Sequence, residues 1–270
     1  MEIVTIGNLD APEVAPYARL TEAQLLNRLH PDEGIFICES MKVIRVALAA
    51  GVQPVSFLCE ERLIPQVEAM MVGALRVPVY TAEREVLRQL TGYELTRGIL
   101  CAMHRPKLPG AEKLLSTLYS PLSTCRVAVL DGVVNSENTG AIFRAAASLG
   151  IDAVLLTRTC CDPLNRRACR VSMGTVFQLP WTFIDNYNQL SDTGFTTVAM
   201  ALTDRSVPVD DPRLKSIEKM AIIMGTEGDG LSANVLNNVD YVARIPMHRG
   251  VDSLNVAAAA AVAFWELRNK

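Results

Sequence analysis

Five short apolar runs in the second half of the chain constrain its fold more than any other feature. They span Arg126–Leu130, Ala153–Leu156, Thr197–Met200, Ala221–Met224 and Val242–Ile245. Each run is followed by a helix or a helical turn. Continuous apolar runs of this length, separated by helices, are typical of strands that are buried on both faces. We therefore predict a parallel sheet with helices covering both of its faces.

The first hundred residues form a smaller α/β pattern. Apolar runs alternate there with helical patterns: strands are expected at Ile35–Cys38, Pro54–Leu58, Val77–Tyr80 and Gly98–Cys101, and helices at Glu22–Leu29, Met41–Ala50, Ile64–Met71 and Glu83–Leu90. A stretch with three prolines and a glycine separates the two patterns. We predict two domains, at residues 1–113 and 123–270, with a linker at about 105–122.

Composition narrows the class of protein. The chain has 270 residues, half of them apolar, and no apolar run as long as the roughly 18 residues of a membrane span. It starts without the pattern of a signal peptide, so we expect a cytoplasmic protein and no membrane partner. Seven cysteines, an odd number, favour reduced thiols over a disulfide framework. With three histidines and no C-x-x-C pair, we expect no metal site.

The net charge of −3 gives no general electrostatic signal for nucleic acid, because neither half of the chain is basic. A nucleic-acid surface would have to be a local patch. The best candidate is a group of four arginines, Arg158, Arg166, Arg167 and Arg170. An ordinary solvated face explains the same residues equally well.

The first of three polar loops at predicted strand ends begins at Asp131. A helix is expected to start near Asn138 or Thr139, with Ile142 and Phe143 on its apolar stripe and Arg144 pointing away. Arg144 is therefore either a solvated arginine or a charge directed into a site. Asn138 is either a helix cap or a site residue.

The second and third loops follow the last two predicted strands. Met224–Ser232 contains three glycines, which let a ligand approach the backbone, but it matches neither the dinucleotide fingerprint nor the phosphate loop. In Arg244–Ala257 we expect Ser253 to cap the final helix and Asn255 to lie in its first turn. That helix, through Leu267, is apolar nearly all round, so it packs inside the domain or across a subunit interface.

Together the loops resemble the SpoU (TrmH-like) family of RNA 2′-O-ribose methyltransferases. The matching segments, in family order, are Asn138–Arg144 (NTGAIFR), Arg170–Trp181 (RVSMGTVFQLPW), Ile223–Ser232 (IMGTEGDGLS) and Ile245–Val256 (IPMHRGVDSLNV). The glycine of the last segment sits later than usual, two residues after His248. Phe36–Gly51 also resembles a substrate-binding domain similar to certain ribosomal proteins, with Ser40 where a glycine often follows the glutamate.

The resemblance implies a deep trefoil knot in the C-terminal domain, a homodimer, an RNA substrate and S-adenosyl-L-methionine as the cofactor. Ribosomal RNA is favoured over transfer RNA. The cofactor would be held mainly by backbone groups, at Gly225, Thr226, Glu227, Gly228, Ile245, Met247 and Leu254. The implied catalytic set is Arg144, Asn138, Glu227, Ser253 and Asn255. Arg144 would contact the reacting nucleotide, and Asn138 would position both Arg144 and the substrate. The other three residues would complete the pocket.

Two alternatives remain open on the sequence. One is an RNA-binding homologue without catalytic activity, against which the intact set of polar residues argues. The other is an enzyme of the same knotted class that methylates a base nitrogen. The Ser253–Asn255 run favours the ribose.

Overall fold

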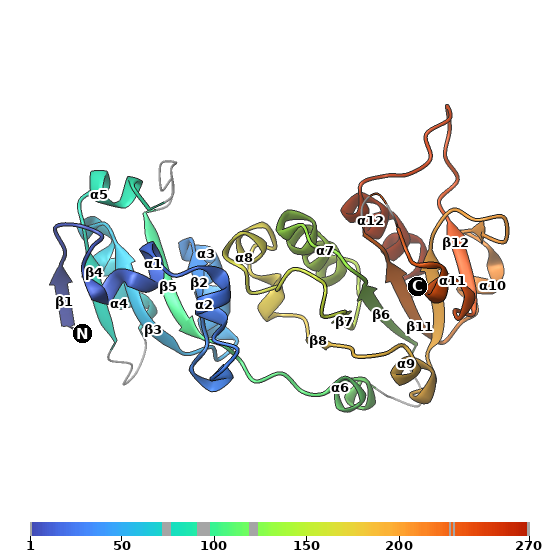
Figure 1. Cartoon of the computed structure of the whole chain (residues 1–270), viewed down its shortest axis with the longest axis horizontal. Coiled ribbons are helices and arrows are strands. Elements are labelled where there is room, and N and C mark those ends of the chain that lie inside the picture. The colour runs from blue at the N-terminus through green and yellow to red at the C-terminus, as the bar shows by residue number, and fades with distance from the viewer. Residues whose placement is uncertain are drawn as a thin grey trace. The chain divides into compact units, whose positions relative to one another are not determined.

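The computed structural model describes residues 2–71, 77–90, 98–118, 124–226, 228 and 230–268. By its internal contacts the chain forms two units (Figure 1). Unit 1 contains Met1–Lys107 and Leu164–Phe177, and unit 2 contains Leu108–Pro163 and Gln178–Lys270. This division is more complex than a single cut near residues 113–123, because Leu164–Phe177 packs within unit 1.

Unit 1 has a five-stranded sheet in the order β1-β4-β3-β5-β2. β1, β4 and β3 are mutually parallel, while β5 runs antiparallel to both β3 and β2. The strands are β1 (Glu2–Thr5), β2 (Ile35–Glu39), β3 (Pro54–Cys59), β4 (Pro78–Thr81) and β5 (Ile99–His104). The helices are α1 (Ala15–Ala18), α2 (Glu22–Leu26), α3 (Met41–Ala49), α4 (Ile64–Met70), α5 (Arg84–Arg88) and α8 (Arg166–Val171).

The predicted strands of unit 1 are confirmed to within three residues at either end, but β1 was not predicted. The helix expected at Glu22–Leu29 ends early, at Leu26. Asn27 is its cap and has a left-handed backbone with φ of 47°, a conformation that terminates helices. Single-turn 3-10 segments occupy Pro12–Val14, Pro31–Glu33, Glu61–Leu63 and Thr175–Phe177.

Unit 2 contains the predicted parallel sheet. Its seven strands lie in the order β10-β12-β9-β11-β6-β7-β8, and every pair is parallel. They are β6 (Cys125–Leu130), β7 (Ala153–Leu156), β8 (Trp181–Phe183), β9 (Thr196–Met200), β10 (Val207–Pro208), β11 (Lys219–Met224) and β12 (Tyr241–Arg244). The five predicted strands are confirmed, while β8 and β10 are additional.

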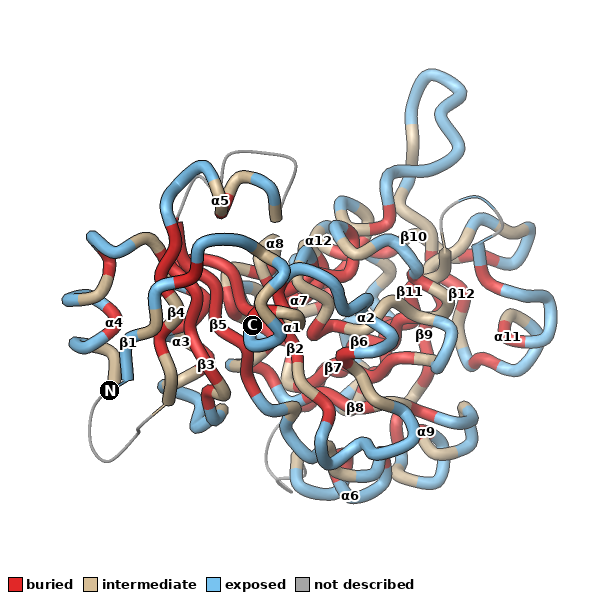
Figure 2. The backbone as a smooth tube through the Cα atoms, turned by 60° about the vertical axis from the view of Figure 1, so that its left-hand side comes forward, coloured by how far each residue is buried: buried red, intermediate tan, exposed pale blue. Residues whose placement is uncertain are grey.

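Helices cover both faces of this sheet, and its strands are buried (Figure 2). The helices are α6 (Ala111–Thr117), α7 (Ser136–Ser148), α9 (Asn188–Asp192), α10 (Pro212–Lys215), α11 (Ala233–Asn237) and α12 (Val256–Leu267). α6 and α9 contribute Leu114, Leu115 and Leu190 to the core with β6 and β11. α7 packs against α12, and α12 also contacts β11. None of the helices in the described ranges is long and apolar enough to cross a membrane.

A buried arginine anchors the far end of α12. Arg126, only 3% exposed, donates from Nε to the carbonyl oxygen of Leu267 over 2.7 Å and from Nη1 to that of Glu218 over 2.8 Å. Burial lowers the pKa of this guanidinium, but an arginine at the C-terminal end of a helix is favoured by the helix dipole. The contacts hold α12 against the strand pair β6–β11.

Candidate functional site

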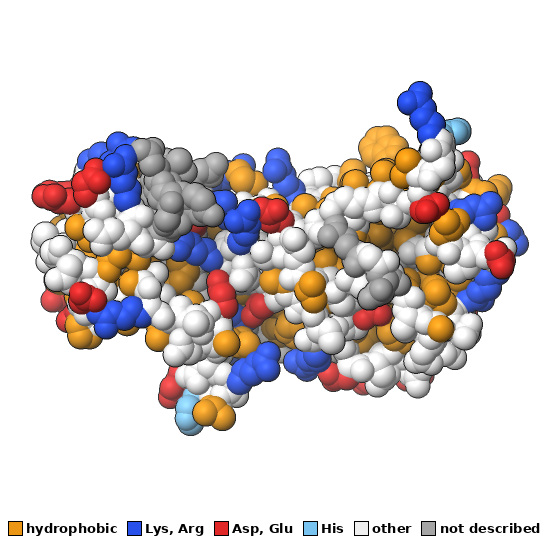
Figure 3. Space-filling model, turned by 45° about the horizontal axis from the view of Figure 1, so that its top comes forward, with side chains coloured by type: hydrophobic (Ala, Val, Ile, Leu, Met, Phe, Trp, Pro, Cys, Tyr) orange, Lys and Arg blue, Asp and Glu red, His pale blue; other side chains and the backbone are white. Residues whose placement is uncertain are grey.

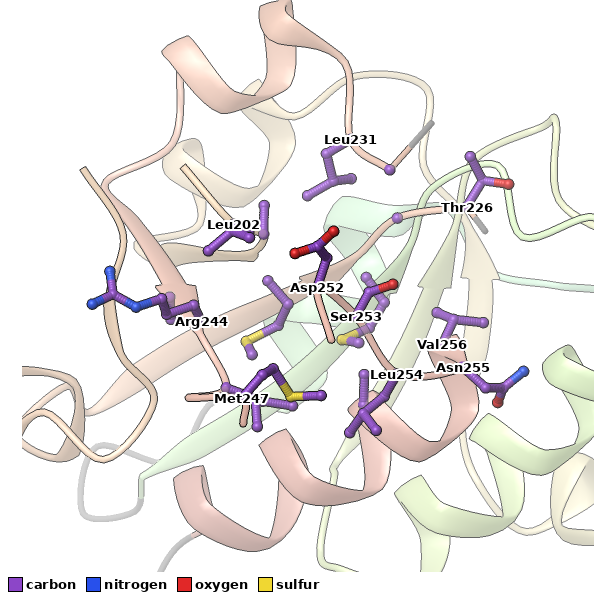
Figure 4. A pocket seen from close by; sticks show the side chains of 18 of the residues that line it. Leu202, Thr226, Leu231, Arg244, Met247, Asp252, Ser253, Leu254, Asn255 and Val256 are labelled. Carbon is purple, nitrogen blue, oxygen red and sulfur yellow. The ribbon is translucent and has the colours of Figure 1, made fainter. Parts of the chain in front are cut away.

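A cavity of about 820 Å³ lies at the carboxyl ends of β9, β11 and β12 (Figure 4). Three segments of unit 2 that follow these strands form one part of its wall: Met200–Leu202, Met224–Thr226 and Arg244–Met247. Residues Val251–Val256 and the first turn of α12 complete it. Ligands of open α/β sheets bind at this edge, so the cavity is the natural candidate site.

The glycine-rich loop after β11 folds tightly back on itself. Thr226 and Gly230 form an isolated antiparallel bridge. A Cβ at Gly225 would lie 2.8 Å from the carbonyl carbon of Gly230 and 2.9 Å from the amide nitrogen of Leu231. Only glycine fits there without moving backbone. Gly225, Gly228 and Gly230, which line the cavity, therefore present main-chain groups to it.

The start of α12 corrects one sequence prediction. Asn255, and not Ser253, caps the helix: its Oδ1 accepts hydrogen bonds from the amides of Ala257 (3.0 Å) and Ala258 (3.3 Å). Ser253 is exposed and lies on the cavity wall before the helix begins. Asparagine is as good a cap as serine, which explains why spacing alone misplaced the helix start by about two residues.

The start of α7 corrects a second sequence prediction, that this helix begins near Asn138 or Thr139. The helix begins at Ser136, with Asn135 as its cap, and so Asn138 lies within the first turn. The Oδ1 of Asn135 accepts from the amides of Glu137 and Asn138. Asn138 is 8% exposed, and its own Oδ1 accepts a hydrogen bond from Asn255 Nδ2 over 3.1 Å. The first turns of α7 and α12 are thus linked side chain to side chain.

The structure brings most of the predicted site residues together. Of the predicted cofactor residues, Gly225, Thr226, Gly228, Ile245, Met247 and Leu254 all line the cavity. Glu227 lies outside the described residues. Ser253 and Asn255 line the cavity too. Asn138 does not line it, but is hydrogen-bonded to Asn255.

Arg144 is the exception. It is exposed on α7, opposite the buried Ile142 and Phe143, and is not among the residues that line the cavity. The predicted apolar stripe of this helix is confirmed. Within one chain, Arg144 therefore points to solvent.

Sequence reasoning missed several lining residues. Leu202 follows β9 and is 62% exposed, and Asp252 precedes Ser253. Among the described lining residues Asp252 is the sole acid and Arg244 the sole base, and the two lie apart in Figure 4. Arg244 Nη1 donates to the carbonyl oxygen and, over 3.1 Å, to the Oγ of Ser206. The position of Met200–Leu202 after a buried strand was a usable signal.

The predicted basic patch is largely paired within its own unit. In unit 1, Arg166 Nε and Arg170 Nη1 contact the carboxylate of Glu39 over 3.0 and 3.3 Å, and Glu39 is 7% exposed. In unit 2, Arg158 pairs with Asp185 over 3.2 Å and its guanidinium lies 4.9 Å from the Phe183 ring centroid. Arg167 is exposed at the start of α8.

The thiol of Cys160, beside the end of β6, is not an activated nucleophile. Cys160 Sγ donates to the carbonyl oxygen of Leu130 over 3.1 Å, and burial raises the pKa of this thiol. Burial and the nearby carboxylate of Asp131 likewise raise the pKa of the Tyr187 hydroxyl. Both groups stay protonated at neutral pH, so neither is a nucleophile there. No cluster of three metal-ligating side chains occurs among the residues that the structure describes.

The fold and the cavity define an α/β protein with a ligand site at the carboxyl edge of an open parallel sheet. The chain belongs to the SpoU rRNA Methylase family, which matches residues 126–265. An uncharacterized tRNA/rRNA methyltransferase of Mycobacterium bovis is 33% identical over 98% of this chain and 92% of its own. The family resemblance inferred from the loops is confirmed.

Two solved structures have the same fold. An S-adenosylmethionine-bound rRNA methyltransferase from Sinorhizobium meliloti matches with a TM-score of 0.82 at 23% identity, over 98% of this chain and 97% of that one. An RNA 2′-O ribose methyltransferase matches with a TM-score of 0.75 at 25% identity, over 98% and 97%. Both alignments cover the two units, so the likeness extends beyond the parallel-sheet unit.

Proposed function

We propose that this protein transfers a methyl group from S-adenosyl-L-methionine to a ribose 2′-hydroxyl of structured RNA, with ribosomal RNA favoured over transfer RNA in view of unit 1. The observation that carries the proposal is the cavity of unit 2. It is built by the two loops that resemble the family's cofactor motifs, and six predicted cofactor residues line it. The names of the similar proteins agree with this activity.

The cavity suits the cofactor in its chemistry. Most of the residues that line it are apolar, among them Met200, Met224 and Leu254, while the glycine at Gly225 leaves backbone groups open to the cavity. Such walls hold a flat base and a ribose while amides and carbonyls read their edges. Arg244 and Asp252 supply one charge of each sign for a ligand with a carboxylate and an ammonium group. Bound there, the cofactor supplies an electrophilic methyl group.

The protein's own task is to align the ribose oxygen and help it lose a proton. Arg144 would contact the 2′-oxygen or the adjacent phosphate. A guanidinium is effectively never deprotonated in proteins, so Arg144 would stabilise developing negative charge or bind phosphate bidentately, and would not act as a base. Asn138, Glu227, Ser253 and Asn255 would orient the substrate and complete the pocket.

A homodimer would bring Arg144 to a cavity. Arg144 does not line the cavity of its own chain, and α12 exposes apolar side chains, with Val262 39% and Trp265 55% exposed. Exposed apolar residues on an otherwise buried helix favour a subunit contact. Arg144 would then act on the cofactor of the partner. We include in this proposal the trefoil knot implied by the family, formed where the loops after β11 and β12 thread together.

Unit 1 would be the substrate-binding domain. Its segment Phe36–Gly51 forms β2 and α3 and carries the resemblance to ribosomal proteins. This favours ribosomal RNA as the substrate.

Two experiments test this proposal. Calorimetric titration with S-adenosylmethionine should give one site per chain, and the absence of binding would contradict the assignment of the cavity. Mixing an inactive Arg144→Ala protein with an inactive Gly225→Ala protein should restore activity through heterodimers. No recovery, with subunit exchange verified, would refute the shared site.

A further inference from the structure

The arginines that the sequence concentrates are mostly paired with carboxylates in the structure. Arg166 and Arg170 are bound to the buried carboxylate of Glu39, and Arg158 is bound to Asp185. Glu39 neutralises one of the two charges of Arg166 and Arg170, and Asp185 neutralises that of Arg158. In a chain of net charge −3, a cation that has no acidic partner is a further candidate for contact with a polyanion.

The loop between β12 and α12 presents such a cation. It projects from unit 2 (Figure 1), and residues 248–255 are exposed throughout. A basic side chain and a histidine stand together at its far end (Figure 3). Arg249 makes no ion pair or side-chain hydrogen bond with the described part of the chain. The base of the same loop, at Ile245, Met247 and Ser253, lines the cavity.

The tip has a defined turn. The amide of Val251 donates to the carbonyl oxygen of His248 over 3.3 Å, and Arg249 and Gly250 between them have φ of 60° and 70°. Two successive left-handed residues are the mark of a type I′ turn, which favours Asn and Gly. An arginine in this conformation costs about 1 kcal/mol in local stability. A strained, unpaired cation at an exposed tip suggests a role outside the fold.

We propose that the His248–Arg249 turn is a contact for a backbone phosphate of the RNA substrate, on the side of the cavity where the substrate enters. The inference rests on the proposed function, since it takes RNA as the ligand. Arg249 would bind phosphate without reading sequence, and would anchor the RNA next to the loop segment that lines the cavity.

The turn itself provides a clean test. Arg249→Gly removes the charge while favouring the left-handed backbone, so the loop keeps its shape. Arg249→Lys keeps the charge, and Lys113→Gln removes one exposed charge from α6 as the matched control. Binding to total ribosomal RNA from a strain that lacks this gene would be measured by filter retention across about 50–300 mM KCl.

We expect Arg249→Gly to weaken RNA binding about three- to tenfold and to lower the slope of log K against log salt by about 0.7–0.9, the value of one phosphate contact. Arg249→Lys and Lys113→Gln should keep the slope, and S-adenosylmethionine should bind all variants equally. An unchanged slope in Arg249→Gly would overturn the inference, as would a changed oligomeric state, which would make the turn a subunit contact. A wild-type protein that binds no cofactor would instead refute the proposed function.

Discussion

Asn255 donates a hydrogen bond from Nδ2 to the Oδ1 of Asn138 over 3.1 Å, across 117 positions of the chain. The same side chain caps α12 through its Oδ1, which accepts from the amides of Ala257 and Ala258. One side-chain amide therefore both caps α12 at the end of the β12–α12 loop and contacts the first turn of α7. This makes Asn255 a positioning residue for the helix that carries Arg144.

Two substitutions at Asn255 separate these tasks. Asn255→Ser keeps a capping oxygen, but its shorter side chain has no amide nitrogen to reach Asn138 Oδ1, so the bridge is lost while the cap remains. We expect methyl transfer to fall at least about tenfold with little change in melting temperature. Asn255→Ala also loses the cap and should cost about 1 kcal/mol of stability. Equal activity of Asn255→Ser and wild type would show that the bridge does not matter.

A substitution at Gly225 tests whether the shape of the loop after β11 matters for cofactor binding. In Gly225→Ala the new methyl group would meet the backbone of Gly230 and Leu231 at 2.8–2.9 Å, so the loop must open. We expect S-adenosylmethionine affinity to fall by at least about tenfold, measured by calorimetry. Gly7→Ala is the control, because a Cβ at Gly7 meets nothing within 4 Å. Normal cofactor binding by Gly225→Ala would mean that this loop is not part of the site.

Ser40 lies in a conformation that suits glycine. Its φ of 85° and ψ of 143° fall in a region that is nearly restricted to glycine, and its Oγ is only a weak cap for α3, 3.5 Å from the Val43 amide. Ser40→Gly should raise the free energy of unfolding by about 1 kcal/mol, because relief of strain exceeds the lost cap. Ser40→Ala keeps the strain and loses the cap, so it should destabilise. Urea denaturation of the pair distinguishes these outcomes, and the reverse order would contradict the strain argument.

Glu39 should matter for stability. Its buried carboxylate accepts from both Arg166 and Arg170, whose own side chains are 23% and 42% exposed, so losing the pair costs less than the about 3–5 kcal/mol of a fully buried one. We therefore expect Glu39→Gln to lower the thermal stability of the chain markedly. Asp10→Asn, which breaks the exposed pair with Arg19, should change it little. If both variants melt alike, the Glu39 cluster contributes nothing to the fold.

Two buried thiols should make the folded state less stable at alkaline pH. Burial raises the pKa of Cys59 to about 11 and that of Cys125 to about 12, from an ordinary 9.0. Because the folded state holds these protons more tightly, their contribution is complete below pH 9.0 and is lost as the pH rises towards 11 or 12. Urea midpoints at about pH 8 and about pH 10 should therefore differ, and less so in the double variant Cys59→Ala/Cys125→Ala. An equal fall in both proteins would rule out the thiols.

Long, strongly patterned elements were predictable from the sequence, and short ones were not. β6 and β11 are continuous apolar runs, whereas β8 and β10 have three and two residues, too few for a pattern. The helix starts were misplaced because Asn135 and Asn255 compete with neighbouring polar residues as caps, and backbone geometry decides between them. Likewise no local pattern indicates that Glu39 would bind Arg166, because that contact depends on Leu164–Phe177 packing within unit 1.

The loops that line the site could be predicted from the sequence, because strand ends and glycines mark them. Contacts between distant parts of the chain could not be predicted, because they depend on how the chain packs in three dimensions. The loops at Gly225 and Met247 follow from strand ends and family motifs. The link between Asn138 and Asn255 joins two distant helix starts, and Asp252 gave no sign in the sequence of lining the cavity.

The most direct measurement is transfer of a labelled methyl group from S-adenosylmethionine to total ribosomal and transfer RNA from a strain that lacks this gene, followed by nucleoside analysis. We predict a single labelled 2′-O-methyl nucleoside in the ribosomal RNA, absent with Arg144→Ala. A labelled base, or no transfer to either RNA by a protein that binds the cofactor, would contradict ribose methylation.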